Sequence, residues 1–585
     1  MTGDAVHCNW AKLPWRTFVM RKSLAVGIAC VLTLSAASIA AAQQPIAVPA
    51  QAQSAGLGFG WGGHGNEPRT ATPIKHLVVI FQENVSFDHY FGTYPYAANP
   101  KGEPAFYARP FTPDVNGLSR RLLTKNPNAA NPLNADAAIN PFRLERAQAA
   151  TADQDHGYTD EQKAFNGGKM DLFPLFTGHG EPLPGGDASE EGKGQVMGYY
   201  DGNTVTAYWN YAQNFALNDN SYGTTFGPSS PGAVNLISGQ TNGVIDTLNG
   251  TGAETDDGNG GLTMIGDPDP IGDICSSPTA NQVTMGGENI GDLLNAKNIT
   301  WGWFQGGFDT TRTNPDGSTG CSRRTLSTVT NTTSNDYSPH HSPFQYYPST
   351  ANPTHARPSS VAMIGKTDAA NHNYDIDDFY AAVDAGNMPA VSFLKAPAYQ
   401  DGHAGYSDPL DEQTFVVHVI NALQQSGEWK DTAVVIAYDD SDGWYDHQDP
   451  PQVNASKGST DAVNGAGICN GRATLPGIDG KPAQGRCGFG PRLPLLVVSP
   501  WARENHVDHT QTDQSSITRF VEDNWLNGKR IGGGSSDAHA GRLDNMFDFF
   551  IPRLFDGKLI LDESTGQPKN HSGWPTWPFG NGMHG

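Results

Sequence analysis

The alternation of apolar and polar stretches along the chain predicts an α/β fold. Short runs rich in β-branched and apolar residues are typical of buried strands, and they occur at 76–82, 299–304, 389–395, 432–438 and 493–499. Stretches with apolar residues at helical spacing fall among them, at 206–217, 287–297, 374–385, 411–425 and 515–525. This alternation indicates a mostly parallel sheet flanked by helices.

Two of the predicted strands end abruptly in side chains that carry oxygen. The first is followed by Glu83 and Asn84, and the strand at 432–438 is followed by Asp439 and Asp440. Open α/β sheets build their sites at the carboxyl ends of strands, so we expect these four residues to meet there. Adjacent carboxylates repel each other unless something positive lies between them. The pattern predicts one divalent metal ion of unknown identity, although the two aspartates alone fit a solvated turn equally well.

A third motif, Phe226–Gly239 (FGPSSPGAVNLISG), places serines before a predicted helix. Pro231 suits the first turn of a helix, which makes Ser230 the expected N-cap and leaves Ser229 just outside it. A hydroxyl there faces the positive end of the helix, where anions such as phosphate bind. Near a metal ion the Ser229 hydroxyl could ionise and act as a nucleophile. Taken alone, a plain turn serine is the commoner interpretation.

Four histidines lie in polar segments that could complete such a site: His156, His340, His341 and His403. An imidazolium can neutralise a phosphate oxygen or protonate a leaving group, so several in one site are chemically reasonable. Each of them alone is more often structural or exposed.

Composition limits the classes of partner. The chain has 585 residues, a net charge of −23, 37% hydrophobic residues, 68 Gly and 41 Pro, which indicates a globular protein with long loops. The longest polar insertions are expected at 100–155, 245–285, 305–372 and 447–490. The acidic charge argues against nucleic acid or an anionic membrane as a large-area partner, whereas a small phosphate ester remains possible.

The N-terminus has the pattern of an export signal. Met20 begins a short basic start, Leu24–Leu34 is mostly apolar, and Ala40–Ala42 offers a cleavage site. We expect a signal peptide over 1–42, with Met20 as an alternative start, a flexible leader over 43–73, and the main domain over 74–585. The alternative is an uncleaved anchor. The expected protein is exported, periplasmic or secreted, with no stable membrane span.

Four cysteines remain after this segment: Cys275, Cys321, Cys469 and Cys487. An even number in an exported protein favours disulfides. Three pairings are possible, and the simplest joins the neighbours in sequence, Cys275 with Cys321 and Cys469 with Cys487.

Five ordered blocks resemble one family. The segment QENVSFDHYFG is similar to the QENRSFDHYFG signature of the bacterial phosphoesterase family that holds acid phosphatase A and phosphatidylcholine-type phospholipases C. Blocks similar to later family motifs follow in the same order: DHGYTDEQKAFNGGKMD, GPSSPGAVNLISG, AYDDSDGWYDH and RLPLLVVSPWARENHVDHTQTDQSSITRFVEDN. The resemblance covers most of residues 74–526. One departure is Val85, where the signature usually has Arg, and an effect on substrate choice remains open.

The resemblance implies an alkaline-phosphatase-like core with a metal-assisted hydroxyl nucleophile. It implies metal ligation by Glu83, Asn84, Asp439 and Asp440, with Asn84 also near phosphate and Ser229 as the nucleophile. It further implies phosphate-contacting or acid roles for His156, His341 and His403, with His340 as a weaker candidate and His447 as a supporting residue. Residues 74–585 would then form a phosphoesterase catalytic domain.

The expected function is an exported phosphoric ester hydrolase. The serine in the GPS block and the adjacent His340 and His341 are closer to the acid phosphatase pattern, so we expect a phosphomonoesterase that forms a phosphoserine. The alternative is a phospholipase C that cleaves phosphatidylcholine-type lipids, with phospholipid as the partner. A remote alternative is a non-catalytic extracellular binding protein.

Overall fold

The computed structural model describes residues 69–550 and 557–569. The predicted signal peptide and most of the predicted leader lie outside these residues. All described residues belong to one compact unit.

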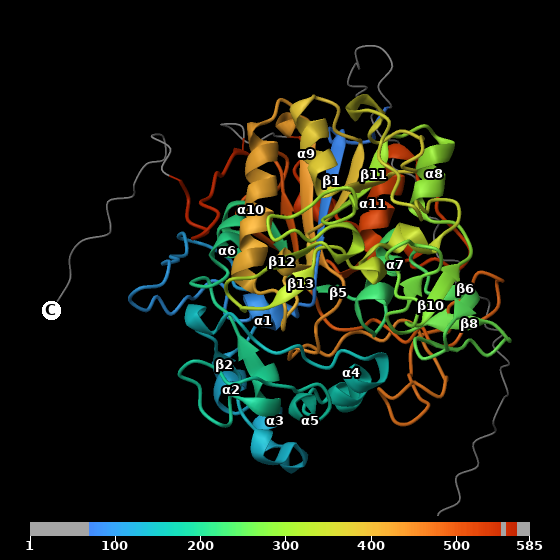
Figure 1. Ribbon diagram of the computed structural model, residues 1–585. Coiled ribbons are helices and arrows are strands. Elements are labelled where there is room, and N and C mark those ends of the chain that lie inside the picture. The colour runs from blue at the N-terminus through green and yellow to red at the C-terminus, as the bar shows by residue number, and fades with distance from the viewer. Residues whose placement is uncertain (1–68, 551–556, 570–585) are drawn as a thin grey trace, which may run out of the picture. The chain divides into compact units, whose positions relative to one another are not determined.

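An eight-stranded sheet forms the centre of this unit (Figure 1). In spatial order its strands are β14 (Asn373–Asp375), β11 (Trp301–Gln305), β15 (Val391–Lys395), β1 (His76–Gln82), β16 (Thr432–Tyr438), β17 (Leu495–Val498), β4 (Ala216–Asn218) and β18 (His506–Asp508). Strand β17 is antiparallel to both neighbours, and every other pair in this sheet is parallel. The expected mostly parallel α/β sheet is therefore confirmed.

Helices cover both faces of the sheet. They are α6 (Thr206–Asn214), α7 (Ser229–Ser238), α8 (Ile290–Ala296), α9 (Ile376–Asp384), α10 (Pro409–Gln425) and α11 (Ser515–Trp525). Figure 1 shows α9 and α10 on one side of the sheet and α7, α8 and α11 on the other. The helix expected over 206–217 is too long, because the backbone leaves helical geometry at Phe215 and the next three residues pair with β17 and β18 as β4.

The predicted cap of helix α7 is wrong. Helix α7 begins at Ser229 itself, with Pro228 in the cap position, so Ser230 lies inside the first turn. Pro231 fits there because the first four N–H groups of a helix have no partner within it. Helix α11 has no side-chain cap, since the hydroxyls of Ser515 and Ser516 donate to the carboxylate of Asp513 at 2.7 and 3.2 Å.

The long insertions carry more regular structure than the sequence indicates. The region expected as a loop at 245–285 forms most of a five-stranded sheet of β7 (Glu254–Asp256), β8 (Leu262–Met264), β6 (Asn242–Leu248), β10 (Gln282–Met285) and β9 (Asp269–Pro270). The other elements are α1 (Phe87–Phe91), α2 (Arg120–Thr124), α3 (Pro127–Ala130), α4 (Tyr158–Phe165), α5 (Phe173–Phe176), and the strand pairs β2 (Phe142–Arg143) with β3 (Gly198–Tyr199), β5 (Ser221–Tyr222) with β19 (Thr512–Asp513), and β12 (Arg324–Leu326) with β13 (Thr333–Asn335).

Two disulfides tie the insertions. Cys275 bonds to Cys321, and Cys469 bonds to Cys487, so the simplest of the three pairings is confirmed. The second bridge closes part of the region 447–490, which follows the loop after β16.

Candidate active site

Strand register brings the two polar strand ends together. Strands β1 and β16 are parallel neighbours, and Gln82 pairs with Tyr438, so the residues that follow each strand meet at the same edge of the sheet. The backbone N–H of Asn84 donates to Oδ1 of Asp439 at 3.1 Å. Both strands are buried along almost their whole length, which fixes this register through their apolar side chains.

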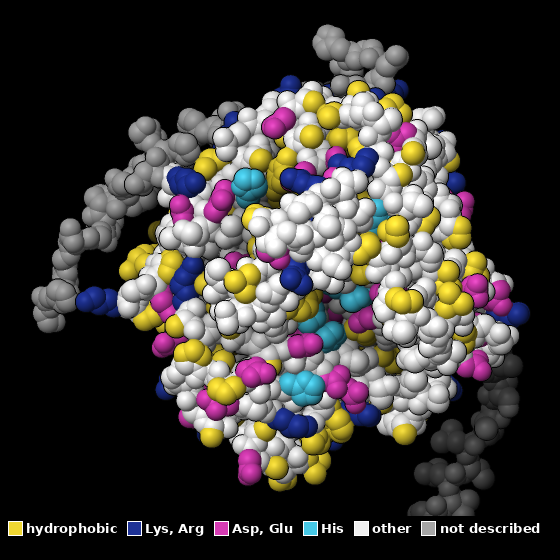
Figure 2. All heavy atoms as spheres, in the orientation of Figure 1, with side chains coloured by type: hydrophobic (Ala, Val, Ile, Leu, Met, Phe, Trp, Pro, Cys, Tyr) yellow, Lys and Arg dark blue, Asp and Glu magenta, His cyan; other side chains and the backbone are white. Residues whose placement is uncertain are grey.

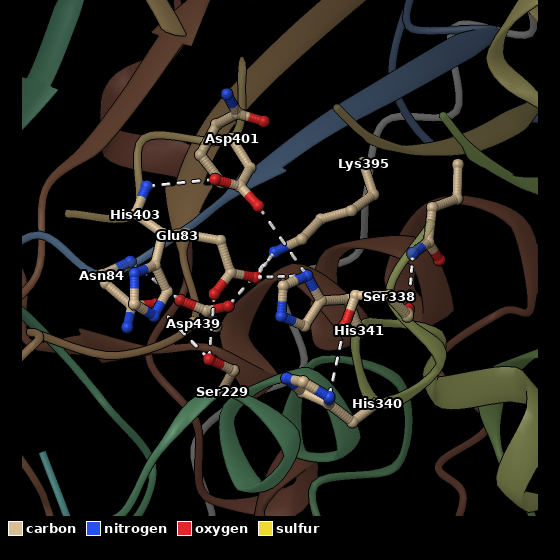
Figure 3. A network of polar contacts seen from close by, with 12 residues as sticks. Glu83, Asn84, Ser229, Ser338, His340, His341, Lys395, Asp401, His403 and Asp439 are labelled. Carbon is tan, nitrogen blue, oxygen red and sulfur yellow. Dashed lines mark hydrogen bonds and ion pairs between the residues drawn. The ribbon is translucent and has the colours of Figure 1, made fainter. Parts of the chain in front are cut away.

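Ser229 lies among these side chains (Figure 3). Its hydroxyl donates to Oε2 of Glu83 at 2.9 Å and lies 3.2 Å from Oδ2 of Asp440. Helix α7 can approach so closely because residue 232 is glycine, where a Cβ would lie 2.1 Å from the carbonyl oxygen of Asp439. Ser229 is 2% exposed, so a reacting group would meet its hydroxyl away from bulk water.

Lys395 is a site residue that the sequence analysis missed. It ends strand β15, which pairs with β1 on the side opposite β16, so its side chain reaches the same strand ends. Its ammonium forms an ion pair with Glu83 and lies 3.2 Å from Oδ2 of Asp439. The available signal was its position as the last residue of a predicted strand.

Three of the four predicted histidines surround the carboxylates. Nδ1 of His341 lies 3.2 Å from Oε1 of Glu83. The rings of His156 and His403 are 5.7 Å apart, and Nε2 of His156 lies 3.4 Å from Nδ2 of Asn84. Figure 2 shows histidine side chains gathered around a hollow near the centre of the view, with acidic side chains beside it.

His340 is placed differently. Its Nδ1 lies 3.2 Å from the hydroxyl of Ser338 and 3.9 Å from Asp269, and the side chain is 31% exposed. Its ring meets that of His341 edge-on at 4.3 Å. His340 therefore lines the approach to the site rather than the carboxylate group itself (Figure 3).

Several buried side chains of the site have pKa values shifted from their ordinary values. Burial and the neighbouring Glu83 raise the pKa of Asp439 to about 8. Burial alone would lower the pKa of His156, but Asp440 and Asp442 outweigh it and hold that pKa well above its ordinary value. Burial, with His340 and Lys395 nearby, lowers the pKa of His341 well below its ordinary value. One imidazolium and one neutral imidazole thus flank the same carboxylates.

The amide of Asn84 tests whether this donor set fits a cation. Its oxygen lies 2.7 Å from Oε2 of Glu83 and 3.2 Å from Oδ1 of Asp439. Turning the amide over would give both of its atoms partners without a metal. A cation among these oxygens would instead make the present orientation favourable, because hard divalent ions prefer carboxylate and amide oxygens. The donor set fits one divalent ion, whose identity it does not fix.

Three further acids, all missed from the sequence, support the site. Asp442 lies 3.2 Å from Nδ1 of His156. Asp401 lies 3.9 Å from Nδ1 of His341. Glu161 accepts from the hydroxyl of Ser441 at 2.7 Å and from the backbone N–H of Gly227 at 3.2 Å, so it joins the turn after β16 to the loop before α7. Asp401 and Asp442 lie several residues beyond the strands predicted at 389–395 and 432–438, and Glu161 follows no predicted strand, so only the fold places them.

His447 belongs to a second buried group, the Arg492 cluster, made of Asp88, Asp446, His447 and Arg492. Its Nδ1 lies 2.6 Å from Oδ2 of Asp88. Arg492 donates to Asp88 and to Asp446, at 3.0 Å in each case. Val85 lies between the two groups in sequence, is 1% exposed, and donates its backbone N–H to the carbonyl of Asp440 at 2.9 Å.

No helix among the residues at 69–550 and 557–569 is long and apolar enough to cross a membrane.

Comparisons with known proteins agree with the motifs. A family model described as the Phosphoesterase family matches residues 74–526. The chain is 25% identical over 518 residues to non-hemolytic phospholipase C of Pseudomonas aeruginosa. The aligned region covers 87% of this chain and 59% of that protein. It is 24% identical over 473 residues to phospholipase C A of Mycobacterium tuberculosis, which covers 78% of this chain and 75% of that one.

The match to the Pseudomonas protein thus spans 59% of that relative's length. Among solved structures, murine ectonucleotide pyrophosphatase/phosphodiesterase 5 is 10% identical with a TM-score of 0.28, over 59% of this chain and 95% of that one. The expected class of phosphoric ester hydrolases is confirmed at the level of the family.

Proposed function

Because the chain belongs to the Phosphoesterase family, we propose that it hydrolyses phosphoric esters through attack by the hydroxyl of Ser229. One observation carries this proposal. The buried hydroxyl stands at the first residue of α7 and within 3.2 Å of carboxylate oxygens from Glu83 and Asp440, which come from two different strand ends. A helix N-terminus beside such a hydroxyl favours the charge of a phosphate group.

Glu83, Asn84, Asp439 and Asp440 would hold one divalent ion. When bound, that ion would act as a Lewis acid toward the phosphate and lower the pKa of the Ser229 hydroxyl. Lys395 neutralises part of the carboxylate charge from the side of β15 and holds Glu83 and Asp439 in position.

The residues also provide a route for the protons. As the Oγ–P bond forms, the hydroxyl proton leaves along the hydrogen bond to Glu83, whose other oxygen lies 3.2 Å from the neutral His341. The bond from phosphorus to the leaving alcohol breaks, and the imidazolium of His156 gives its proton to that oxygen. Water then attacks phosphorus and gives one proton to His156, the bond from phosphorus to Oγ breaks, Ser229 takes back its proton from Glu83, and the phosphate product leaves.

The substrate class follows less directly from the site. The relatives reported above are named phospholipases C, which favours a lipid phosphodiester over the phosphomonoester expected from the GPS block. We therefore propose phospholipase C activity. Acid phosphatase activity is the second candidate, because Ser229 and the adjacent His340 and His341 fit that pattern.

We also propose that residues 74–585 are the catalytic domain of an exported protein, periplasmic or secreted. Two disulfides support this location, because such bonds persist in oxidising compartments.

Replacing the nucleophile tests the reaction. Ser229→Ala should lower kcat/KM by about 10³-fold or more, which corresponds to roughly 4 kcal/mol of transition-state stabilisation. The matched control is Ser238→Ala, which removes another buried hydroxyl at the far end of the same helix. Near-normal turnover by Ser229→Ala, or an equal loss in the control, would overturn the assignment.

A second experiment separates the substrate classes. Purified protein is given an aryl phosphomonoester, a soluble short-chain phosphatidylcholine and a phosphatidylcholine emulsion between pH 5 and pH 8. Higher kcat/KM for the phosphatidylcholines supports phospholipase C, and higher kcat/KM for the monoester at every pH supports the phosphatase.

A further inference from the structure

Three large apolar side chains are exposed in one stretch of the insertion after α1. Tyr96 is 69% exposed, Tyr107 is 75% exposed and Phe111 is 99% exposed. A single exposed apolar residue is ordinary on a protein surface, but exposed aromatics gathered in one segment indicate an interaction site.

The backbone holds Phe111 outward. The N–H of Thr112 donates to the carbonyl of Arg109 at 3.2 Å, which closes a turn with Phe111 near its tip. Phe111 has a φ of 67°, a left-handed conformation that is unfavourable for a bulky side chain. Strain of this kind persists only where the surrounding structure imposes it, and it is concentrated at functional sites.

The base of this loop is firmly attached. Phe106 is 3% exposed and its ring meets that of Trp209 edge-on at 5.2 Å. The backbone N–H of Arg109 donates to the side chain of Gln213 at 2.6 Å. Tyr107 and Phe111 therefore lie on a loop that Phe106 and Arg109 attach to the body of the protein.

The charge of the segment is opposite to that of the chain. Residues 101–125 contain five basic and two acidic residues, within a chain of net charge −23. Arg109 pairs with Glu504 at 2.8 Å. Over 69–550 and 557–569 the other four basic residues have no acidic partner, namely Lys101, Arg120, Arg121 and Lys125. The net charge of the chain argues against binding to an anionic membrane. The local excess of basic residues means that this argument does not apply to residues 101–125.

The segment starts from the same end of the sheet as the candidate active site. Helix α1 begins three residues after Asn84 and leads directly into it, as the blue trace in Figure 1 shows. Farther along, the side-chain oxygen of Asn116 lies 3.2 Å from Nε2 of His447, in the loop that follows β16.

We propose that residues 96–125 dock this protein onto an anionic lipid surface. Tyr107 and Phe111 enter the headgroup level, where aromatic rings are favoured, and Arg120, Arg121 and Lys125 attract anionic headgroups. This inference rests on the proposed function, because it assigns the site a substrate that lies in an interface.

The test uses the full chain and vesicles of phosphatidylcholine, alone or with phosphatidylglycerol added. The wild type should co-sediment with the mixed vesicles, more weakly at high salt. The variant Tyr107→Ser/Phe111→Ser should bind about tenfold more weakly or worse. The variant Arg120→Glu/Arg121→Glu should lose the preference for phosphatidylglycerol. The matched control, Ile245→Ser/Ile274→Ser, removes two side chains that are each 60% exposed elsewhere and should bind like the wild type.

Turnover of a soluble aryl phosphodiester separates the two proposals. All variants should retain it, because none of the changed residues belongs to the candidate active site. Wild-type binding by the aromatic variant, an equal loss in the isoleucine control, or equal binding of the wild type to both vesicles would overturn the docking proposal. If the wild type does not hydrolyse the soluble phosphodiester, the proposed function is wrong. The vesicle-binding result would still decide the docking proposal.

Discussion

The carboxyl edge of the sheet carries two buried acidic groups that differ in how their charge is balanced. In the Arg492 cluster, two aspartates face one guanidinium and one histidine, with every ion pair at 3.0 Å or less. In the Ser229 cluster, defined as Ser229, Glu83, Asp401, Asp439, Asp440 and Lys395, four acids face a single ammonium. The neighbouring His156 adds one positive charge, but it pairs with a fifth acid, Asp442, at 3.2 Å.

The titration of the two groups reflects this difference. Burial would raise the pKa of Asp88, but His447 and Arg492 hold it below its ordinary value, whereas burial still raises the pKa of Asp446 against the attraction of Arg492. Burial and Glu83 raise the pKa of Asp439 to about 8, because Lys395 does not compensate fully. The first group carries its own counter-charges and suits a structural role, whereas the second keeps an excess of acid that an added cation would balance. The location of unbalanced charge thus distinguishes the candidate site from a similar cluster beside it.

The largest expected effect comes from removing a carboxylate from the Ser229 cluster. Asp440→Asn should lower kcat/KM by about 10³-fold, because it weakens both the predicted metal site and the hydrogen bond to Ser229. The free energy of unfolding of metal-free protein should change by less than about 1 kcal/mol, because removing one of several neighbouring buried carboxylates relieves their repulsion and offsets the lost attraction to His156. Steady-state kinetics and urea unfolding measure the two quantities. More than a tenth of normal turnover would contradict the prediction.

The next effect comes from breaking the balanced group. Arg492→Met should lower the free energy of unfolding by about 3–5 kcal/mol, because two buried carboxylates lose their partner. Arg486→Met is the matched control, since Arg486 is equally buried but bonds to backbone carbonyls at Pro476, Gly534 and Gly239. We expect a smaller loss there, and equal losses would show that charge pairing is not what Arg492 contributes.

Metal and pH should act together on the Ser229 cluster. The pKa of Asp439 is raised from 3.8 to about 8, so the metal-free folded state binds more protons than the unfolded state between these values. The contribution of Asp439 to the free energy of unfolding is therefore largest at low pH and falls as the pH rises toward 8. A bound cation replaces those protons, so the rise in Tm on adding metal to chelator-treated protein should be larger at pH 8 than at pH 6. A rise that shrinks with pH would contradict this, and Asp440→Asn should reduce it at both values.

The smallest effect concerns Ser230. Its hydroxyl lies 3.2 Å from that of Tyr346 and donates to the carbonyl of His340 at 3.3 Å, rather than capping α7. Ser230→Ala should therefore cost about 0.5–1.5 kcal/mol of stability, as expected for one buried hydrogen bond. Chemical denaturation measures this. A loss above about 2 kcal/mol would indicate that the residue supports the histidine turn more strongly than these contacts suggest.

The sequence could predict the part of the site that strands deliver. Glu83 and Asp439 follow long apolar runs, and strand pairing alone brings them together. Lys395 also lies at the end of a predicted strand. It was missed because a lysine at a strand end is usually exposed on the surface. Glu161 and Asp442 act from segments without periodicity, and their neighbours are set by the packing of α4 against the loops.

The errors in secondary structure have a common cause. Residues 216–218 continue a helical pattern, yet pairing with β17 and β18 forms a strand. The five-stranded sheet of the insertion has strands of two to seven residues rich in Gly, Asp and Thr, which carry little apolar alternation. In both places long-range pairing decides the structure and local sequence does not.

The central position of β1 has a consequence for synthesis. Both of its neighbours, β15 and β16, lie hundreds of residues later in the chain, so β1 leaves the ribosome with two unpaired edges. Ser229, Glu83, Lys395 and Asp440 can meet only after residue 440 has emerged, and the long sequence separation makes that step slow. A chain that ends before residue 440 would therefore not hold the complete site.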